Sequence, residues 1–450
     1  MSNVSLVTLF HFDVLAGIMI ALVSFIGLIV GLFAARYVQG DSQYNKFFAS
    51  LGLLVLSIII MAASDNLLIF LVAWGISNLL LVRLMIHKPI WKAATSSGWL
   101  AAKAFIIGFI SLASAFALFY YGTRQTSIQA ILHSLDVTSP LSIIAMILIV
   151  VAAMSQSAIW PFHRWLISSL NSPTPVSAIM HAGLVNGGGF LLVRFAYLYF
   201  SSPTILTIIF ILGLGTALVG TLWKLMQNDI KRMLACSTMG QMGFMFVQCG
   251  LGLFPAAVTH LCWHGLFKAN LFLSSNNVIQ EKRLFSEFPP TPTAFFLACL
   301  CGFLGSYIFS LVSHKQWLTT DTTFILLIVV LITAVQFALS LLQSTPWKRL
   351  PMTILLTGLM CVLYGYSVHI VEFLLSPLDL MHPQALNTFH YIGLILLITL
   401  WVIMLFKDRL VQHNSLSRLL PLLYVKALNA SQPHRSTITS HRNQYRYDGG

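Results

Sequence analysis

Charged side chains are scarce in this sequence of 450 residues. Only 8% of the residues are Asp, Glu, Lys or Arg, whereas 58% are hydrophobic. An average soluble domain carries about 25% charged residues. This composition excludes an ordinary water-facing surface and indicates a protein that lies in a membrane.

Motifs for redox, metal or nucleotide chemistry are also missing. The six cysteines lie in apolar stretches without the spacing of metal ligands, so we interpret them as small core residues. Gly213 and Gly215 precede no strand–helix unit and therefore do not form a nucleotide-binding turn. No basic segment and no small-residue cleavage site flank the first apolar run, which we expect to be retained as a span. We expect no cofactor and no metal in this chain, and no catalysis by it alone.

Apolar stretches long enough to cross a bilayer recur along the chain, and nothing alternates like a barrel strand. Because backbone polar groups in lipid must be satisfied within the segment, we predict an all-α polytopic membrane protein of about thirteen transmembrane helices. Residues 1–410 would form this transmembrane domain, and residues 411–450 a basic cytoplasmic tail that is too polar to span. The predicted spans are 14–34, 46–63, 66–86, 98–120, 141–160, 176–200, 204–226, 233–250, 252–276, 292–313, 322–342, 350–374 and 388–406.

The placement of basic residues gives the orientation. A net charge of +13 could suggest nucleic acid, but the charges gather in alternate loops, as the positive-inside rule requires. We therefore expect no nucleic-acid partner, an N-terminus outside and a C-terminus in the cytoplasm. The alternate loops hold only Arg124, Arg194 and Lys315, whereas the loops after odd-numbered spans hold Arg36, Lys46, Arg83, Lys88, Lys92, Arg164, Lys224, Lys231, Arg232, Lys282, Arg283, Lys348 and Arg349.

The strongest candidate site is the stretch THLCWHGLFKANLF in the ninth predicted span. His260, His264 and Lys268 are spaced i, i+4 and i+8, so they share one helix face over about 12 Å. Imidazoles can pass protons along such a row, and a desolvated lysine can load and unload one. The structural alternative is two core histidines bonded to carbonyls beside a lysine that reaches the interface. A half metal site is disfavoured because no third ligand lies nearby in the sequence.

A second unusual stretch is SLNSPTPVSAIMHAGLVNGGGF. Pro173 and Pro175 mark the start of a helix, where a missing N–H costs little. His181 follows as a proton-relay candidate, which could also be a satisfied core histidine, and Asn186 lies just over a turn later. The glycines at 187–189 allow another helix to approach closely.

Two further candidates lie earlier in the chain. Pro161 frees a carbonyl late in the fifth predicted span, so we expect a helix break there, with His163 in the break. Lys103, in GWLAAKAF, is either an interfacial anchor or a pathway group.

These runs resemble a known family. SQSAIWPFHRWLISSLNSPTPVSAIMHAGLVNGGGFLLVRF, NDIKRMLACSTMGQMGFMF and THLCWHGLFKANLFLSSNNVIQEK are similar to the signature blocks of the antiporter-like membrane subunits of respiratory complex I and Mrp antiporters. The opening FHFDVLAGIMIALVSFIGLIVGLFAARYVQGDSQYNKFF is similar to their early portion, so the resemblance covers about residues 10–285. It implies inverted five-helix repeats with broken helices, at spans two to six and seven to eleven. It also implies a cation route through His181, His260, His264 and Lys268.

Within this family the tail YVKALNASQPHRSTITSHRNQYRY is similar to the DabB-type branch. That resemblance implies a subunit in a bacterial cell (inner) membrane that conducts H⁺ or Na⁺ for inorganic-carbon uptake. It further implies a cytoplasmic DabA-like zinc partner that resembles β-carbonic anhydrases and makes CO2 hydration vectorial.

Two departures from the family pattern leave alternatives open. The usual glutamate is replaced by Gly75 and the usual lysine by Gln156, and losing both avoids an unpaired buried charge. A respiratory NADH-quinone oxidoreductase or Mrp-type Na⁺/H⁺ antiporter subunit would carry that pair. A non-conducting scaffold that docks a cytoplasmic enzyme would not need it.

Overall fold

The computed structural model describes residues 9–275, 290–317, 319–342, 346–406 and 419–438. Within these residues the regular structure is helical, with isolated β-bridges in place of strands. The long helices are α1 (Val14–Tyr37), α2 (Tyr44–Ala63), α3 (Leu67–Met85), α4 (Lys92–Thr123), α6 (Pro140–Gln156), α11 (Pro203–Leu225), α12 (Ile230–Gly250), α13 (Phe254–Leu273), α14 (Pro292–Val312), α15 (Thr323–Leu342), α16 (Pro346–Leu375) and α17 (Thr388–Leu405). The shorter helices are α5 (Ile128–Ser134), α7 (Arg164–Ile167), α8 (Thr174–Ala182), α9 (Gly187–Arg194), α10 (Ala196–Phe200) and α19 (Leu419–Ala430).

The chain is a multi-pass membrane protein. Every predicted span coincides with a helix or, at α8–α9, with an interrupted pair of helices. Among the described residues, 10 segments are long and apolar enough to cross a bilayer. Helix α6, with 17 residues, is shorter, and the polar helices α12 and α13 are not among the ten.

Short polar residues determine where helices begin. The side chain of Asp13 accepts a hydrogen bond from the backbone N–H of Ala16 at 2.8 Å and so caps α1. Asn66 caps α3 and Asp229 caps α12 in the same way. Each cap satisfies an N–H that has no partner inside the helix, so the polar residues between the apolar runs fix the helix ends.

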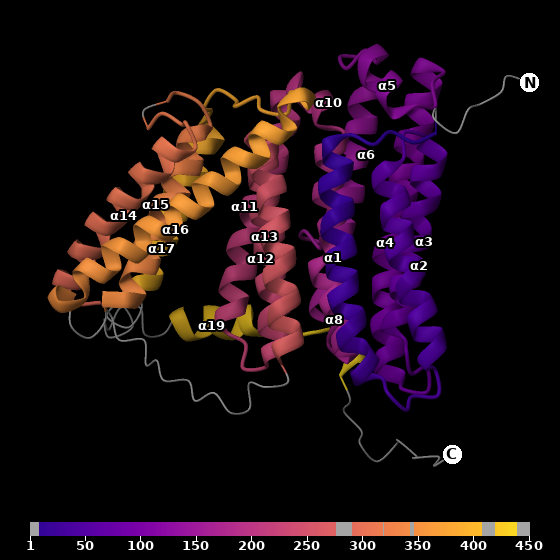
Figure 1. Cartoon of the computed structure of the whole chain (residues 1–450), viewed down its shortest axis with the longest axis horizontal. Coiled ribbons are helices and arrows are strands. Elements are labelled where there is room, and N and C mark those ends of the chain that lie inside the picture. Colours follow the sequence, from indigo (N-terminus) through magenta and orange to yellow (C-terminus); the bar gives the residue numbers. More distant parts are fainter. Residues whose placement is uncertain (1–8, 276–289, 318, 343–345, 407–418, 439–450) are drawn as a thin grey trace, which may run out of the picture.

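The helices form a main bundle and a lateral group (Figure 1). The main bundle comprises α1–α13, which share one large hydrophobic core. The lateral group comprises α14–α17; it leans away from the bundle and contains two smaller cores of its own. Helix α16 connects the two parts by packing against α13.

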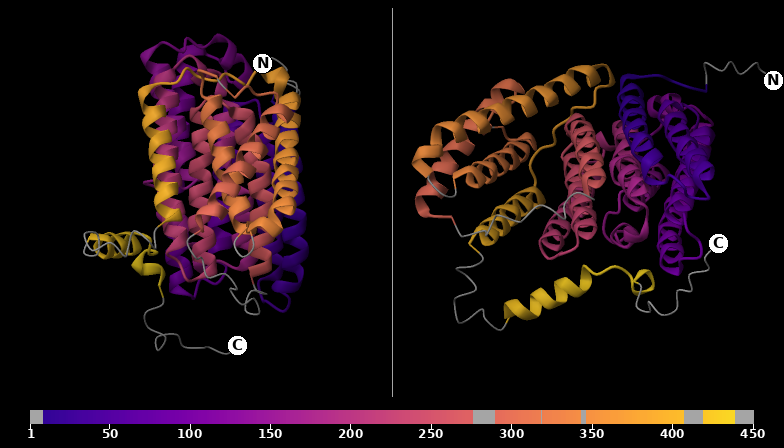
Figure 2. Two further views of the ribbon diagram at one scale, coloured as in Figure 1. Left: turned by 90° about the vertical axis from the view of Figure 1, so that its left-hand side faces the viewer. Right: turned by 60° about the horizontal axis from the view of Figure 1, so that its bottom comes forward.

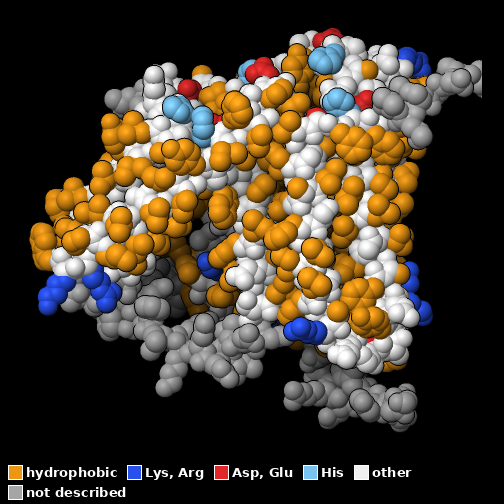
Figure 3. Space-filling model, in the orientation of Figure 1, with side chains coloured by type: hydrophobic (Ala, Val, Ile, Leu, Met, Phe, Trp, Pro, Cys, Tyr) orange, Lys and Arg blue, Asp and Glu red, His pale blue; other side chains and the backbone are white. Residues whose placement is uncertain are grey.

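Charge separates along the long axis of the helices. In Figure 3, most of the visible Lys and Arg side chains lie toward the lower end of the molecule, and most of the visible Asp, Glu and His side chains lie at the upper end. We call these the basic end and the acidic end. The C-terminus of α1 and the N-terminus of α2 lie at the basic end. The N-termini of α1 and α3 lie at the acidic end (Figure 1).

The described part of the predicted tail is ordered against the basic end. Helix α19 lies across this end, nearly perpendicular to the spans (Figure 2). It is followed by residues 431–437, which we call the tail strap. The rest of the predicted tail, 411–418 and 439–450, lies outside the described residues.

The tail strap bridges separate elements of the main bundle. Ser431 Oγ accepts a hydrogen bond from Gln227 Nε2 at 2.8 Å, just before α12. At its other end, the carbonyl of Thr437 accepts one from Asn171 Nδ2 at 2.8 Å, in the segment that precedes α8. The strap therefore ties the α7–α8 region to the base of α12.

Candidate functional site

The chain breaks twice beside the candidate site. Helix α6 ends at Gln156, five positions before Pro161, which lies in a turn after a cis Trp160–Pro161 bond. Helix α8 begins with Pro173 at its N-cap and Pro175 in its first turn. It gives way at Gly183 to the short 3-10 turn Leu184–Asn186 before α9 starts.

Side chains from α6 satisfy the backbone at the second break. Ser157 Oγ donates to the carbonyl of Val185 at 2.7 Å, and Gln156 Nε2 donates to the carbonyl of Leu184 at 3.3 Å. These bonds replace helical hydrogen bonds that an interrupted segment cannot make, which is how irregular backbone is tolerated at membrane depth.

His163 lies in the first break, directly before α7, and is 6% exposed. Its ring lies 5.2 Å from that of Trp223, near the basic end of α11. Within the described residues, its Nδ1 has no hydrogen-bond partner. His163 is therefore separated along the bundle axis from the histidines of α13.

His181 and Lys268 are linked through one backbone carbonyl of α12, that of Leu234; Lys268 bonds it directly and His181 through Thr238. His181 Nδ1 lies 3.1 Å from Thr238 Oγ1, and the Thr238 hydroxyl donates to the carbonyl of Leu234 at 2.9 Å. Lys268 Nζ donates to the same carbonyl at 3.0 Å. His181 also stacks on Phe272 with 4.4 Å between ring centroids, so α8, α12 and α13 fix its position together.

His264 is held from the break between α8 and α9. Its Nδ1 lies 3.3 Å from Asn186 Oδ1, and its Nε2 is buried without a partner among the described residues. The ring of His260 lies 6.1 Å from that of His264 and 5.4 Å from that of Phe244.

Four of the six predicted pathway residues, His181, His260, His264 and Lys268, thus form one buried polar row between α8–α9 and α12–α13. Their exposed fractions are 1% for both His181 and Lys268, 5% for His264 and 8% for His260. Lys268 does not reach the interface, and no ion pair to it occurs in the described part of the chain. An unpaired buried ammonium is costly. The row is therefore a candidate for proton exchange rather than for permanent charge.

The position of the family's charge pair is neutral and tightly packed. Gln156 borders a cavity of about 10 Å³ together with Trp74, Ser77 and apolar residues of α1 and α2, a volume that suits about one water molecule. Gly75 faces α4, where a Cβ would lie 2.9 Å from the ring of Phe109. A side chain at Gly75 would therefore have to displace the ring of Phe109, and the cavity beside Gln156 holds no more than about one water molecule.

Lys103 lies apart from the buried row. It is exposed on α4, about 16 Å along the helix from its start at Lys92. Nothing in the described residues links it to His181 or to the histidines of α13.

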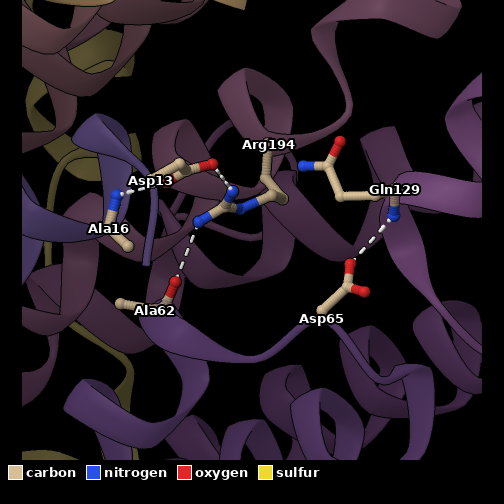
Figure 4. A network of polar contacts seen from close by, with 6 residues as sticks. All are labelled: Asp13, Ala16, Ala62, Asp65, Gln129 and Arg194. Carbon is tan, nitrogen blue, oxygen red and sulfur yellow. Dashed lines mark hydrogen bonds and ion pairs between the residues drawn. The ribbon is translucent and has the colours of Figure 1, made fainter. Parts of the chain in front are cut away.

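A charged cluster at the acidic end joins the first helix to the end of α9 (Figure 4). Arg194 pairs with Asp13, and both side chains are 5% exposed. Arg194 also donates to the carbonyl of Ala62 at 2.8 Å. Nearby, Asp65 accepts a hydrogen bond from the backbone N–H of Gln129 at 2.9 Å. Arg194, which the sequence suggested to be a loop residue, is a structural anchor.

A second pair in the lateral group was missed by reasoning from sequence. Lys315 Nζ donates to Glu372 Oε1 at 2.6 Å, with side-chain exposures of 5% and 17%. The rings of His314 and His369 lie 4.9 Å apart beside it. The sequence signal was weak, because 57 positions separate the paired residues. Among the described residues, no three His, Cys, Asp or Glu side chains form a metal-binding group.

Two family models match this sequence. The family described as NADH:quinone oxidoreductase/Mrp antiporter, transmembrane, matches residues 64–289. The N-terminal family of complex I chain 5 matches residues 1–48.

Curated relatives show the same similarity. The chain is 34% identical, over 87% of its length and 76% of the relative's, to a probable inorganic carbon transporter subunit, DabB1, of Halothiobacillus neapolitanus. It is 40% identical, over 60% of its length, to the DabB subunit of Bacillus anthracis, of which it covers 54%. It is 34% identical, over 59% of its length, to NADH-quinone oxidoreductase subunit L of Escherichia coli, of which it covers 44%.

A solved Mrp complex from a Dietzia species shares the fold. The TM-score is 0.58 at 21% identity, and the match covers 94% of this chain and 45% of the other.

Proposed function

The chain belongs to the membrane family of NADH:quinone oxidoreductases and Mrp antiporters, with DabB-type subunits among its relatives, and on this premise we propose that it conducts a cation. The cation is H⁺ rather than Na⁺, and it drives an inorganic-carbon (CO2 or bicarbonate) uptake complex. The single observation that carries this proposal is the buried row of His181, His260, His264 and Lys268. Three imidazoles and one amine without a carboxylate partner suit proton exchange, whereas Na⁺ requires oxygen ligands.

The cytoplasmic side of the protein is the basic end, in line with the positive-inside rule. The proposed topology has thirteen crossings of a bacterial inner membrane, with α6, α12 and α13 crossing in addition to the ten apolar segments. Two inverted five-helix repeats would then meet between α9 and α11. Transport sites in such proteins form at the repeat interface, which is where α8–α9 and α12–α13 bring the buried row together.

The proposed partner is a cytoplasmic zinc protein that resembles a carbonic anhydrase. Support comes from the tail strap and α19, which lie at the basic end and are available to a cytoplasmic protein. Helix α19 carries four consecutive exposed apolar residues, Leu422, Leu423, Tyr424 and Val425. Cation flow through this chain would make CO2 hydration by the partner one-directional.

A non-conducting scaffold is the second candidate. It is favoured by one observation, the neutral, tightly packed positions of Gly75 and Gln156. A respiratory or Mrp-type antiporter subunit fits less well, since it would use the charge pair that these positions lack.

The test uses cells that lack carbonic anhydrase and express this gene with its partner gene. Lys268→Met is expected to lower bicarbonate accumulation by about 10²-fold, the contribution typical of a positioned proton-transfer group. Lys348→Met, which changes an exposed lysine at the basic end, is the matched control and should accumulate normally.

The outcomes separate the candidates. An uncoupler should abolish accumulation in wild-type cells, and both variants should co-purify with the partner. Normal accumulation by Lys268→Met would contradict conduction through the row, and accumulation that survives the uncoupler would favour the scaffold.

A further inference from the structure

The hydrogen bonds around Asn186 determine which nitrogen of His264 carries the proton. Asn186 Nδ2 donates to the carbonyls of Ala182 at 2.7 Å and Leu261 at 3.5 Å. Two carbonyl acceptors fix the orientation of the amide, so Oδ1 is the atom that faces His264 at 3.3 Å. A carbonyl oxygen only accepts. Nδ1 of His264 must therefore donate, and Nε2 is left as the bare acceptor.

The same reasoning applies to His181. The single hydroxyl hydrogen of Thr238 is used in the bond to the carbonyl of Leu234. Thr238 Oγ1 can then only accept from His181 Nδ1, which lies 3.1 Å away. His181 is also the Nδ1–H tautomer, with Nε2 as its acceptor.

These bonds cannot themselves carry a proton from His181 to Lys268. The chain of donors runs from His181 through Thr238 to the carbonyl of Leu234, and Lys268 donates to that carbonyl from the other side. A backbone carbonyl has no proton to pass on. The bonds therefore orient the side chains, and any transfer uses other atoms.

We propose that Asn186 and Thr238 are positioning residues that hold His264 and His181 as Nδ1–H tautomers, so that Nε2 is the atom that gains and loses the transported proton. This inference rests on the proposed function and deepens it. In each step a proton binds the Nε2 lone pair to give an imidazolium, and the same N–H bond breaks when the proton moves on. Nδ1–H persists throughout. Each ring therefore binds and releases the proton at the same nitrogen, Nε2, and no proton enters at one nitrogen and leaves at the other.

The surroundings of His264 are consistent with proton binding at Nε2. The titratable groups whose charge acts on His264 are Lys268 and His260 from its own helix and His181 from α8. Its Nε2 has no partner among the described residues, so this lone pair is free for a proton or a water molecule. Proton binding turns this acceptor into an N–H donor, so the proton can stay on Nε2 only where a water molecule or a neighbouring group accepts from it.

The first experiment reads the tautomers directly. Nitrogen-15 solid-state NMR of the histidine-labelled wild-type protein in lipid distinguishes protonated from bare ring nitrogens, and His264→Gln and His181→Gln identify the two rings by loss of signal. We expect Nδ1 protonated and Nε2 bare in both neutral rings. An Nε2–H tautomer in either ring would overturn the inference for that ring, whether or not the protein conducts.

Matched variants then test the positioning role. Thr238→Ser keeps the hydroxyl, whereas Thr238→Val removes it at equal size. Asn186→Asp keeps an acceptor for Nδ1–H, whereas Asn186→Leu does not. Loss of a group that orients a metal-bound histidine typically costs about 10- to 100-fold in activity, and we take the same order of magnitude for these two rings. We therefore expect Val and Leu to mix the tautomers and lower proton flux by about that factor, and Ser and Asp to retain the wild-type tautomer.

Flux and tautomer together separate the possible failures. Wild-type tautomers in Thr238→Val and Asn186→Leu would refute the positioning role. The second possible failure is that the tautomers change as expected but His264→Gln and Lys268→Met transport normally. That result would refute the proposed function and leave the tautomer assignment intact.

Discussion

The buried pair between Lys315 and Glu372 gives a quantitative test of the lateral group. Its atoms lie 2.6 Å apart, and the exposures of 5% and 17% leave little room for water to replace either partner. Removing one partner strands a buried charge, which typically costs about 3–5 kcal/mol. Glu372 keeps some contact with solvent, so we expect about 3 kcal/mol for Lys315→Met and for Glu372→Gln alone.

The double variant should behave differently from the sum of the two. Replacing a buried ion pair with neutral residues of similar size is often nearly neutral. The double variant should therefore lie within about 1 kcal/mol of wild type, whereas independent residues would add to about 6 kcal/mol.

The free energy of unfolding is measured for wild type, the two single variants and the double variant. Each protein is unfolded in mixed micelles by a denaturing detergent, and unfolding is followed by tryptophan fluorescence. Lys348→Met, at an exposed site, is the control and should stay within about 0.5 kcal/mol of wild type. If Lys315→Met costs the same whether or not Glu372 is present, the two residues are not coupled and the argument fails. If the double variant is stable but cannot support uptake, the pair has a role in transport beyond holding the segment after α14 to α16.

Two further predictions concern helix packing and the tail. Gly213→Ala should destabilise the protein by about 1–3 kcal/mol, because its Cβ would lie 2.6 Å from a backbone nitrogen of α12; Gly215→Ala, with nothing within 4 Å, should be neutral or slightly stabilising. The same detergent titration compares them, and equal losses would contradict the close approach of α11 and α12. Deletion of residues 431–450 removes the tail strap and should reduce co-purification of the cytoplasmic partner, whereas deletion of 439–450 keeps the strap and should not. Equal recovery of the partner with both truncations would exclude a docking role for the strap.

The sequence predicted the helices well because their signal is local. Apolar length and short polar caps such as Asn66 depend only on neighbouring residues, and each predicted span coincides with helical structure. The i, i+4, i+8 spacing likewise placed His260, His264 and Lys268 on one face of α13. A break was expected late in the fifth span, and α6 ends at Gln156, a few residues before the expected end at 160. The interruption at Gly183, within the predicted span 176–200, was not expected.

The partners of these residues were beyond prediction because they come from other helices. Asn186 reaches His264 across 78 positions, and Thr238 reaches His181 across 57. Asn186 belonged to a stretch that the sequence marked as unusual, but nothing local indicated that it bonds His264. Thr238 did not stand out, because a threonine in a helix commonly bonds its own turn. Asn186 and Thr238 become partners of the two histidines only because α8–α9 packs against α12–α13.

The neutral residues at Gly75 and Gln156 are physically consistent with the position of the buried row. A charge pair between α3 and α6 would stabilise a route inside the proposed first repeat, where Gly75 instead lies against Phe109 and Gln156 bonds a backbone carbonyl. The titratable groups lie elsewhere, between α8–α9 and α12–α13. Because Gln156 bonds Leu184, only two residues before Asn186, the uncharged site supports the same broken segment that orients His264. Loss of the charge pair therefore does not imply loss of conduction, and the proposed route lies between α8–α9 and α12–α13, where the two proposed repeats would meet.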